Sequence, residues 1–281
     1  MKKIFRKLQI GMLIFLFLFN TFLIPTEAKK DLITDGKGIW VNIWNYPENP
    51  ALYCEYLQEH DINTVYLQIS RSNTPAIKHP EKLNEILKEA HKRNIKIIGW
   101  TYPFLKDPVA DAEKFITAAK YTSPEGERLD SIASDIEEVT DQKSISKYSS
   151  RIRSKMGSDF ELIAITFSPV LKRANPKHYA WKTIADNFDI LCPMTYWTWN
   201  KEYRSEKGAY QYTANTIKLI KEYTNNPNVR IHLIGDGQKT SLEELSGFLK
   251  AASDNGVKGV SIYPMYKPTI AQVKLLNKFR I

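Results

Sequence analysis

The chain has 281 residues, of which 43% are hydrophobic and 25% are charged. This composition excludes a disordered chain, a collagen-like repeat and a small disulfide-stapled protein, and the length suffices for one large core or two modest ones. The 40 basic residues outnumber the 31 acidic ones. The sequence has no basic stripe interleaved with aromatic residues of the kind that binds nucleic acids. The excess positive charge therefore indicates a solvated surface or acidic cell-envelope polymers nearby.

The N-terminus has the pattern of an export signal. Four basic residues between positions 2 and 7 precede an apolar run from Ile10 to Phe19, and Pro25 is followed by Thr26-Glu27-Ala28. This order predicts a signal peptide over residues 1–28, cleaved after Ala28. An uncleaved anchor is the alternative, because the apolar stretch from Leu8 to Ile24 nearly spans a bilayer. We expect a secreted or envelope-associated protein without stable membrane insertion after cleavage.

The remaining chain alternates short β-branched runs with amphipathic stretches, which is typical of repeated strand–helix units. The expected strands are Gly38–Trp44, Ile62–Ser70, Ile95–Tyr102, Leu129–Val139, Phe160–Pro169, Phe188–Trp197, Val229–Asp236 and Val257–Met265. Helices are expected over Pro80–Asn94, over Ser241–Asn255, where Ser241 and Glu244 have capping-box spacing, and over Thr269–Phe279.

Eight such units predict a single (β/α)₈ TIM barrel over residues 29–281, preceded by the signal peptide. A doubly wound open sheet is the alternative. That fold normally carries a glycine-rich phosphate turn after its first strand, whereas this chain has Trp44-Asn45-Tyr46-Pro47 there.

The active site of such a barrel lies at the carboxyl ends of its strands, and these ends are rich in aromatic residues. The candidates are Trp44, Trp100, Tyr102, Tyr196, Trp197, Trp199 and Tyr263. Flat rings pack well against the C–H faces of sugars. The alternative for any single ring is that it fills the top of the barrel, but together the rings favour a polysaccharide or oligosaccharide ligand.

The fourth expected strand carries two carboxylates at alternate positions, Asp135 and Glu137. Side chains two apart share one face of a strand, so both point into the barrel. Burying two carboxylates side by side raises at least one pKa, as a general acid requires. The alternative is a structural pair held by Arg or Lys. Glu138 has the opposite parity and is expected to face away from the cleft unless the strand has already ended.

This strand resembles a known signature. Asp130, Ala133, Asp135 and Glu137 are similar to the DxxDxDxE motif of glycoside hydrolase family 18, the chitinases and their relatives, and the segment Trp181–Trp197 resembles that family's sixth strand, with Met194-Thr195-Tyr196 at its Met-x-Tyr element. The resemblance implies a retaining, substrate-assisted mechanism with Glu137 as general acid/base, Asp135 orienting the N-acetyl group and Tyr196 hydrogen-bonding it.

The match departs from the family at three places. Ala133 replaces the middle Asp of the motif, the third strand lacks a Ser-x-Gly-Gly element, and Tyr263 stands where a Trp usually forms the floor of the sugar site. These differences disfavour an ordinary chitinase. They favour a distant glycosidase-like barrel with a different sugar or with lost activity.

Other residues were weighed as site candidates. Asp236 ends the seventh strand, where it serves either as a nucleophile for double displacement or as a turn residue. Gln68, Ser70 and Arg71 close the second strand and are placed to bind hydroxyls or an anionic sugar group. Ser168 lacks the setting of a serine hydrolase.

The five histidines and two cysteines form no metal-ligand pattern, so no metal or cofactor is expected, and Cys54 and Cys192 are not expected to form a disulfide. We expect the protein to be a monomer. The sequence patterns lead to two alternative functions. The first is an exported glycoside hydrolase acting on an N-acetylated polysaccharide such as a chitin-like glycan, peptidoglycan or a matrix glycan. The second is a non-catalytic carbohydrate-binding barrel.

Overall fold

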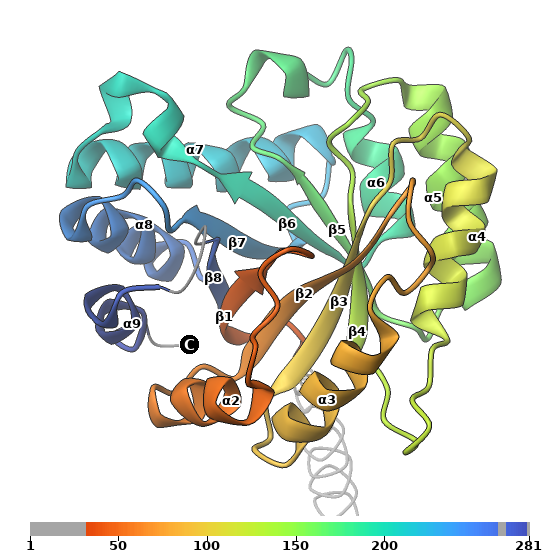
Figure 1. Cartoon of the computed structure of the whole chain (residues 1–281). Helices are drawn as coiled ribbons and strands as arrows, with labels where there is room; N and C mark the ends of the chain where they lie inside the picture. The colour runs from red at the N-terminus through yellow and green to blue at the C-terminus, as the bar shows by residue number, and fades with distance from the viewer. Residues whose placement is uncertain (1–31, 264–267, 280–281) are drawn as a thin grey trace, which may run out of the picture. The chain divides into compact units, whose positions relative to one another are not determined.

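Eight parallel strands close into a barrel in chain order, with β8 paired to β1 (Figure 1). The computed structural model describes residues 32–263 and 268–279, so the predicted signal peptide lies outside these ranges. The strands are β1 (Gly36–Val41), β2 (Thr64–Arg71), β3 (Lys96–Tyr102), β4 (Ser131–Asp135), β5 (Leu162–Phe167), β6 (Ile190–Thr195), β7 (Arg230–Asp236) and β8 (Gly259–Tyr263). The predicted TIM barrel is confirmed.

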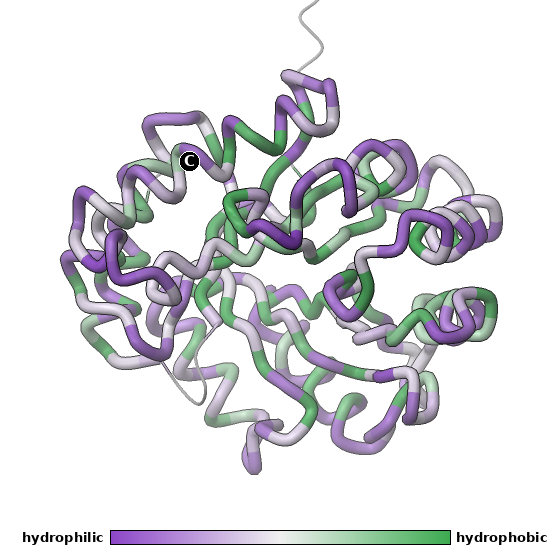
Figure 2. The backbone as a smooth tube through the Cα atoms, turned by 90° about the horizontal axis from the view of Figure 1, so that it is seen from above, coloured by the Kyte–Doolittle hydropathy of each residue, from purple (hydrophilic) through white to green (hydrophobic). Residues whose placement is uncertain are grey.

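Helices surround the strands (Figure 1). They are α2 (Pro50–Glu59), α3 (Pro80–His91), α4 (Pro108–Ala119), α5 (Gln142–Met156), α6 (Trp181–Asn187), α7 (Glu206–Tyr223), α8 (Leu242–Asp254) and α9 (Ile270–Leu276), with short 3₁₀ helices η1 (Lys172–Ala174), η2 (Trp197–Trp199) and η3 (Lys201–Tyr203). Figure 2 shows that the outer helices carry both hydrophilic and hydrophobic residues, as expected where one face packs on the barrel and the other meets water.

The helices begin at the residues that local chemistry favours. The side chains of Asn49 and Asp107 accept backbone N–H groups in the first turns of α2 and α4, and a proline follows each cap. Ser241 and Glu244 form the predicted capping box of α8. Gly256, just past that helix, has a φ of 68°, a backbone conformation that favours glycine.

Most predicted strands are longer than the observed ones. Ile62, Ile95, Phe188 and Val257 are buried but precede the strands to which they were assigned. An apolar run in the sequence therefore predicts which residues are buried, but not which of them form the hydrogen bonds between neighbouring strands. Strand β4 ends at Asp135, four residues before the predicted end, which places Glu137 in the following loop. Met265 lies outside the described residues.

Candidate active site

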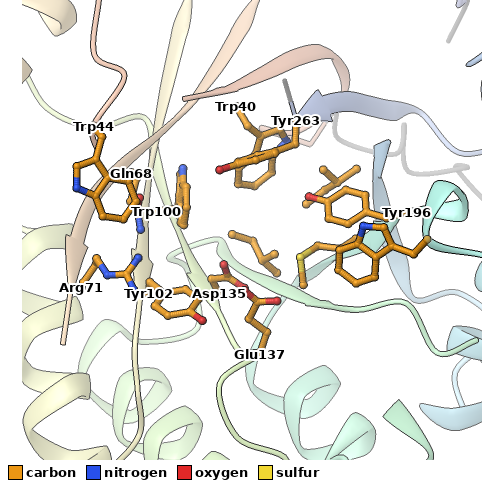
Figure 3. A pocket seen from close by; sticks show the side chains of 14 residues that line it. Trp40, Trp44, Gln68, Arg71, Trp100, Tyr102, Asp135, Glu137, Tyr196 and Tyr263 are labelled. Carbon is orange, nitrogen blue, oxygen red and sulfur yellow. The ribbon is translucent and has the colours of Figure 1, made fainter. Parts of the chain in front are cut away.

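A pocket of about 260 Å³ lies where the carboxyl ends of the strands meet (Figure 3). All eight strands, or the loops directly after them, contribute to its lining. The lining residues are Trp40, Trp44, Gln68, Arg71, Trp100, Tyr102, Asp135, Glu137, Ile165, Met194, Tyr196, Trp199, Ile234 and Tyr263. Ligand pockets commonly measure about 300–1,000 Å³, so this one encloses only a short part of a longer ligand.

The structure brings together every predicted site residue except Ser70, Trp197 and Asp236. Ser70 is fully buried, and its hydroxyl donates to the carbonyl of Pro75 at 2.8 Å. Sequence reasoning missed Trp40, although its even spacing from Trp44 within the expected strand was a usable signal. It also missed Ile165 and Ile234, which carry no signal that separates them from ordinary core residues.

Trp197 does not line the pocket, although the sequence predicts it among the candidate rings at the strand ends. Its side chain is fully buried and stacks on Phe248 of α8, with ring centroids 5.2 Å apart. Trp199 is 53% exposed and lies edge-on to Tyr196 at 5.2 Å. The chain leaves β6 as the 3₁₀ helix η2, which has three residues per turn, so residues two apart do not share a face as they would in a strand.

Asp236 organises a loop rather than the pocket wall. It is buried, and its Oδ1 accepts the backbone N–H groups of Gln238 at 2.7 Å and Lys239 at 3.3 Å. The hydroxyl of Thr198 donates to its Oδ2. Both oxygens are therefore engaged in joining the loop after β7 to η2, as a turn residue requires, and neither lines the pocket.

The segment after β4 continues the strand direction although the strand has ended. The N–H of Ile136 donates to the carbonyl of Ile165 at 2.9 Å, and the hydroxyl of Tyr179 donates to the carbonyl of Ile136 at 2.6 Å. These two bonds hold the backbone between Asp135 and Glu137, and both carboxyl groups line the pocket (Figure 3). Tyr179 is therefore a positioning residue for the acid pair.

Burial dominates the electrostatics of this pair. It raises the pKa of Asp135 well above its ordinary value, and the charge of Glu137 adds to the shift. Burial also raises the pKa of Glu137, against the opposing charge of Arg173. Glu138 is exposed and accepts the Tyr102 hydroxyl at 2.7 Å. Both carboxyl groups thus have raised pKa values, as a general acid requires.

The floor of the pocket is a packed polar and aromatic layer. The Trp40 ring stacks on Tyr66 with centroids 4.2 Å apart, and its Nε1 donates to Ser261 Oγ at 2.7 Å. Ser261 Oγ lies 2.7 Å from His232 Nε2, and His232 Nδ1 lies 2.9 Å from the carbonyl of Thr34. Burial lowers the pKa of His232 to about 4, so this histidine is neutral, and both of its ring nitrogens have hydrogen-bond partners within the barrel.

Across residues 32–263 and 268–279, no group of three or more His, Cys, Asp or Glu side chains is placed to hold a metal ion. No helix in these ranges has the length and apolar character needed to cross a membrane. Cys54 and Cys192 are both buried and free, as predicted.

Solved structures resemble this fold, whereas no protein-family profile and no curated protein matches the sequence. The spore cortex-lytic enzyme SleL of Bacillus cereus aligns over 88% of this chain and 75% of its own with a TM-score of 0.64 at 12% identity. A chitinase from Chromobacterium violaceum aligns over 87% and 98% with a TM-score of 0.63 at 11% identity. The xylanase and α-amylase inhibitor protein XAIP-II of Scadoxus multiflorus aligns over 88% and 99% with a TM-score of 0.63 at 14% identity. The chain therefore shares the eight-stranded barrel fold of these three proteins, in agreement with the fold that the resemblance of its fourth strand implies.

Replacing Trp197 and Trp199 one at a time should distinguish a ring in the hydrophobic core from a ring that lines the pocket. Trp197→Ala should lower the free energy of unfolding by about 3–5 kcal/mol because it removes a fully buried ring. Trp199→Ala should change it by less than about 1 kcal/mol because that ring is half exposed. Urea unfolding of both variants measures this, and equal losses would contradict the placement of the two rings.

The raised pKa of Asp135 predicts a defined pH dependence of stability. An unfolded Asp releases its proton near pH 4, while the folded protein keeps it to higher pH. The folded state therefore holds more protons in this window, and stability falls as pH rises. Asp135→Asn should gain stability relative to the wild type between pH 4 and pH 8, measured by urea unfolding at several pH values. Asp159→Asn, at an exposed position, is the control, and a pH-independent difference for Asp135→Asn would contradict the prediction.

Proposed function

We propose that this protein is a glycoside hydrolase that cleaves an N-acetylated polysaccharide with retention of configuration. The observation that carries the proposal is the acid pair of buried Asp135 and half-buried Glu137, which have raised pKa values in a pocket walled by aromatic rings. The exposed rings of Trp44 and Trp199 extend the apolar surface beyond the pocket and suit a chain of sugars. The glycoside hydrolase-like fold supports the same class of activity.

The mechanism follows the family that the fourth strand resembles. Glu137, protonated in the resting site, gives its proton to the glycosidic oxygen while the carbonyl oxygen of the substrate's own N-acetyl group attacks the anomeric carbon. Asp135 orients the amide of that group, and the Tyr196 hydroxyl donates to its carbonyl. Glu137 then accepts a proton from the water that opens the cyclic intermediate, so no separate enzymic nucleophile is needed.

A non-catalytic carbohydrate-binding barrel is the second candidate. Three observations favour it. Ala133 occupies the position of the motif's middle Asp, and Asp135 Oδ1 is buried without a hydrogen-bond partner in the described ranges. The similar structure XAIP-I is an inhibitor protein in complex with trehalose. Retention of Glu137, half-buried and with a raised pKa, favours the enzyme, since binding alone has no need of a general acid.

Replacing Glu137 decides between the two. The mature protein should hydrolyse chitooligosaccharides or peptidoglycan, and Glu137→Gln should reduce turnover by about 10²-fold or more while ligand binding persists, because it keeps the shape and removes the proton. Glu138→Gln is the matched control and should lose less than about tenfold, since Glu138 reaches Tyr102 rather than the pocket.

Binding without turnover in the unsubstituted protein would leave only the second candidate. Full activity of Glu137→Gln together with loss of activity in Glu138→Gln would overturn the assignment of the general acid.

We also propose that the protein is exported and acts outside the cell or at the envelope. The basic start, the apolar run and the Thr26-Glu27-Ala28 triplet support this proposal. Expression of the full chain in a secretion-competent bacterial host should yield a product that begins at Lys29, measured by intact mass. Full-length protein confined to the membrane fraction would indicate an anchor instead.

A further inference from the structure

One side of the pocket carries a cation bound only by aromatic rings. The guanidinium carbon of Arg71, the last residue of β2, lies 4.4 Å from the ring centroid of Tyr102, 5.2 Å from that of Trp44 and 5.5 Å from that of Phe104. Within residues 32–263 and 268–279, its guanidinium contacts these rings rather than a carboxylate. Arg71 therefore faces the pocket with its hydrogen-bond donors free for a ligand.

A second unpaired donor lies on the same side. Gln68 is 1% exposed, and its Oε1 accepts the N–H of Ile43 at 3.0 Å. That bond identifies the remaining atom as the amide nitrogen, which has no hydrogen-bond partner within the described ranges. Figure 3 shows Gln68 and Arg71 together on the side of Trp44. A buried donor without a partner costs free energy, so a ligand acceptor placed there is favoured.

An irregularity in β2 brings these two side chains to one face. Residues three apart in a regular strand point to opposite faces. The pairing of β2 with β3 shifts register between Gln68 and Ser70, and such a bulge re-aims the side chains that follow it. Both Gln68 and Arg71 consequently line the pocket.

The loop after Arg71 is held in place by α4. Lys114 Nζ donates to the carbonyls of Arg71 at 3.2 Å and Thr74 at 2.6 Å, and also to that of Ser72. Asp111, buried in the first turn of α4, accepts the Ser72 hydroxyl at 2.5 Å. The backbone that carries Arg71 is thus fixed before any ligand binds, and such preorganisation lowers the cost of binding.

We infer that Arg71 and Gln68 form a subsite for a carboxylate carried by the glycan, which makes the ligand an acidic N-acetylated glycan. This inference rests on the proposed glycan-binding function of the pocket. A planar guanidinium beside an amide donor matches the two oxygens of a carboxylate, and the rings of Trp44 and Tyr102 flank the sugar that bears it. Tyr196 lies across the pocket (Figure 3), so the subsite leaves the acid pair free for the glycosidic bond.

Binding of a matched pair of ligands tests the subsite. The protein carries Glu137→Gln to prevent hydrolysis. The probes are a tetrasaccharide of alternating N-acetylglucosamine and N-acetylmuramic acid and the methyl ester of the same compound, titrated by calorimetry. The free acid should bind at least about tenfold more tightly than the ester. Arg71→Gln should bring this ratio close to one. Gln68→Glu should lower it, because that variant keeps the acceptor for Ile43 and replaces the donor with a negative charge.

Arg173→Gln is the matched control for general electrostatics. Arg173 is exposed, acts on the charge of Glu137 and does not line the pocket, so this variant should keep the acid preference. A ratio near one before any arginine is replaced, or an equal fall in Arg71→Gln and Arg173→Gln, would overturn the inference. An oligouronate titrated in parallel separates the two sources of a sugar carboxylate, and tighter binding of either acid than of its ester supports the subsite.

Turnover by the unsubstituted protein separates this inference from the proposed activity. Hydrolysis of neutral chitooligosaccharides without acid preference in binding would overturn the subsite alone. Acid preference without hydrolysis of any of these glycans would overturn the glycosidase proposal and leave the subsite standing.

Discussion

The stack of Trp40 on Tyr66 inside the barrel sets the depth and the polarity of the pocket. Closing eight parallel strands directs alternate side chains inward, and that space has to be filled. Gly38 makes room for the stack, because a Cβ there would lie 2.6 Å from the Tyr66 ring. Above this polar and aromatic layer the carboxyl groups of Asp135 and Glu137 lose water, and the resulting desolvation is the main cause of their raised pKa values.

The acid pair differs from the motif it resembles in what lies beneath it. Ala133 is fully buried and offers only a methyl group, so Asp135 has no carboxyl neighbour deeper in the barrel along β4. Its charge state depends instead on burial, on Glu137 and on the opposing charge of Arg71. The proposed mechanism therefore relies on two carboxyl groups and the cations around them, rather than on a proton relay along the strand.

The sequence predicted the barrel well because its signals are periodic and repeated. Alternation along eight runs and the caps at Ser241 and Gly256 each reflect local chemistry, and so does the inward parity of Asp135. The failures came where the backbone leaves regular geometry. The position of Trp197 was predicted wrongly because η2 is a 3₁₀ helix. Its side chains repeat every three residues, whereas those of a strand repeat every two.

Arg71 and Gln68 illustrate a second limit. Both were recognised as candidates at the end of the second strand, but strand parity would have put them on opposite faces, and only the shifted register explains how they meet. The arrangement of Arg71 also depends on Lys114 and Asp111, which lie about 40 positions further along the chain. A pattern of neighbouring residues in the sequence cannot predict contacts between positions so far apart.

The clamp between α4 and the loop at positions 71–75 has a consequence for how this barrel can diversify. Because Lys114 and Asp111 support the loop backbone, the loop and the first two turns of α4 form one structural unit. Side chains at the tip of the unit are free to vary, and ligand preference with them, as long as the two α4 residues persist. Grafting the loop alone into another barrel would transfer its amino-acid sequence without its backbone conformation.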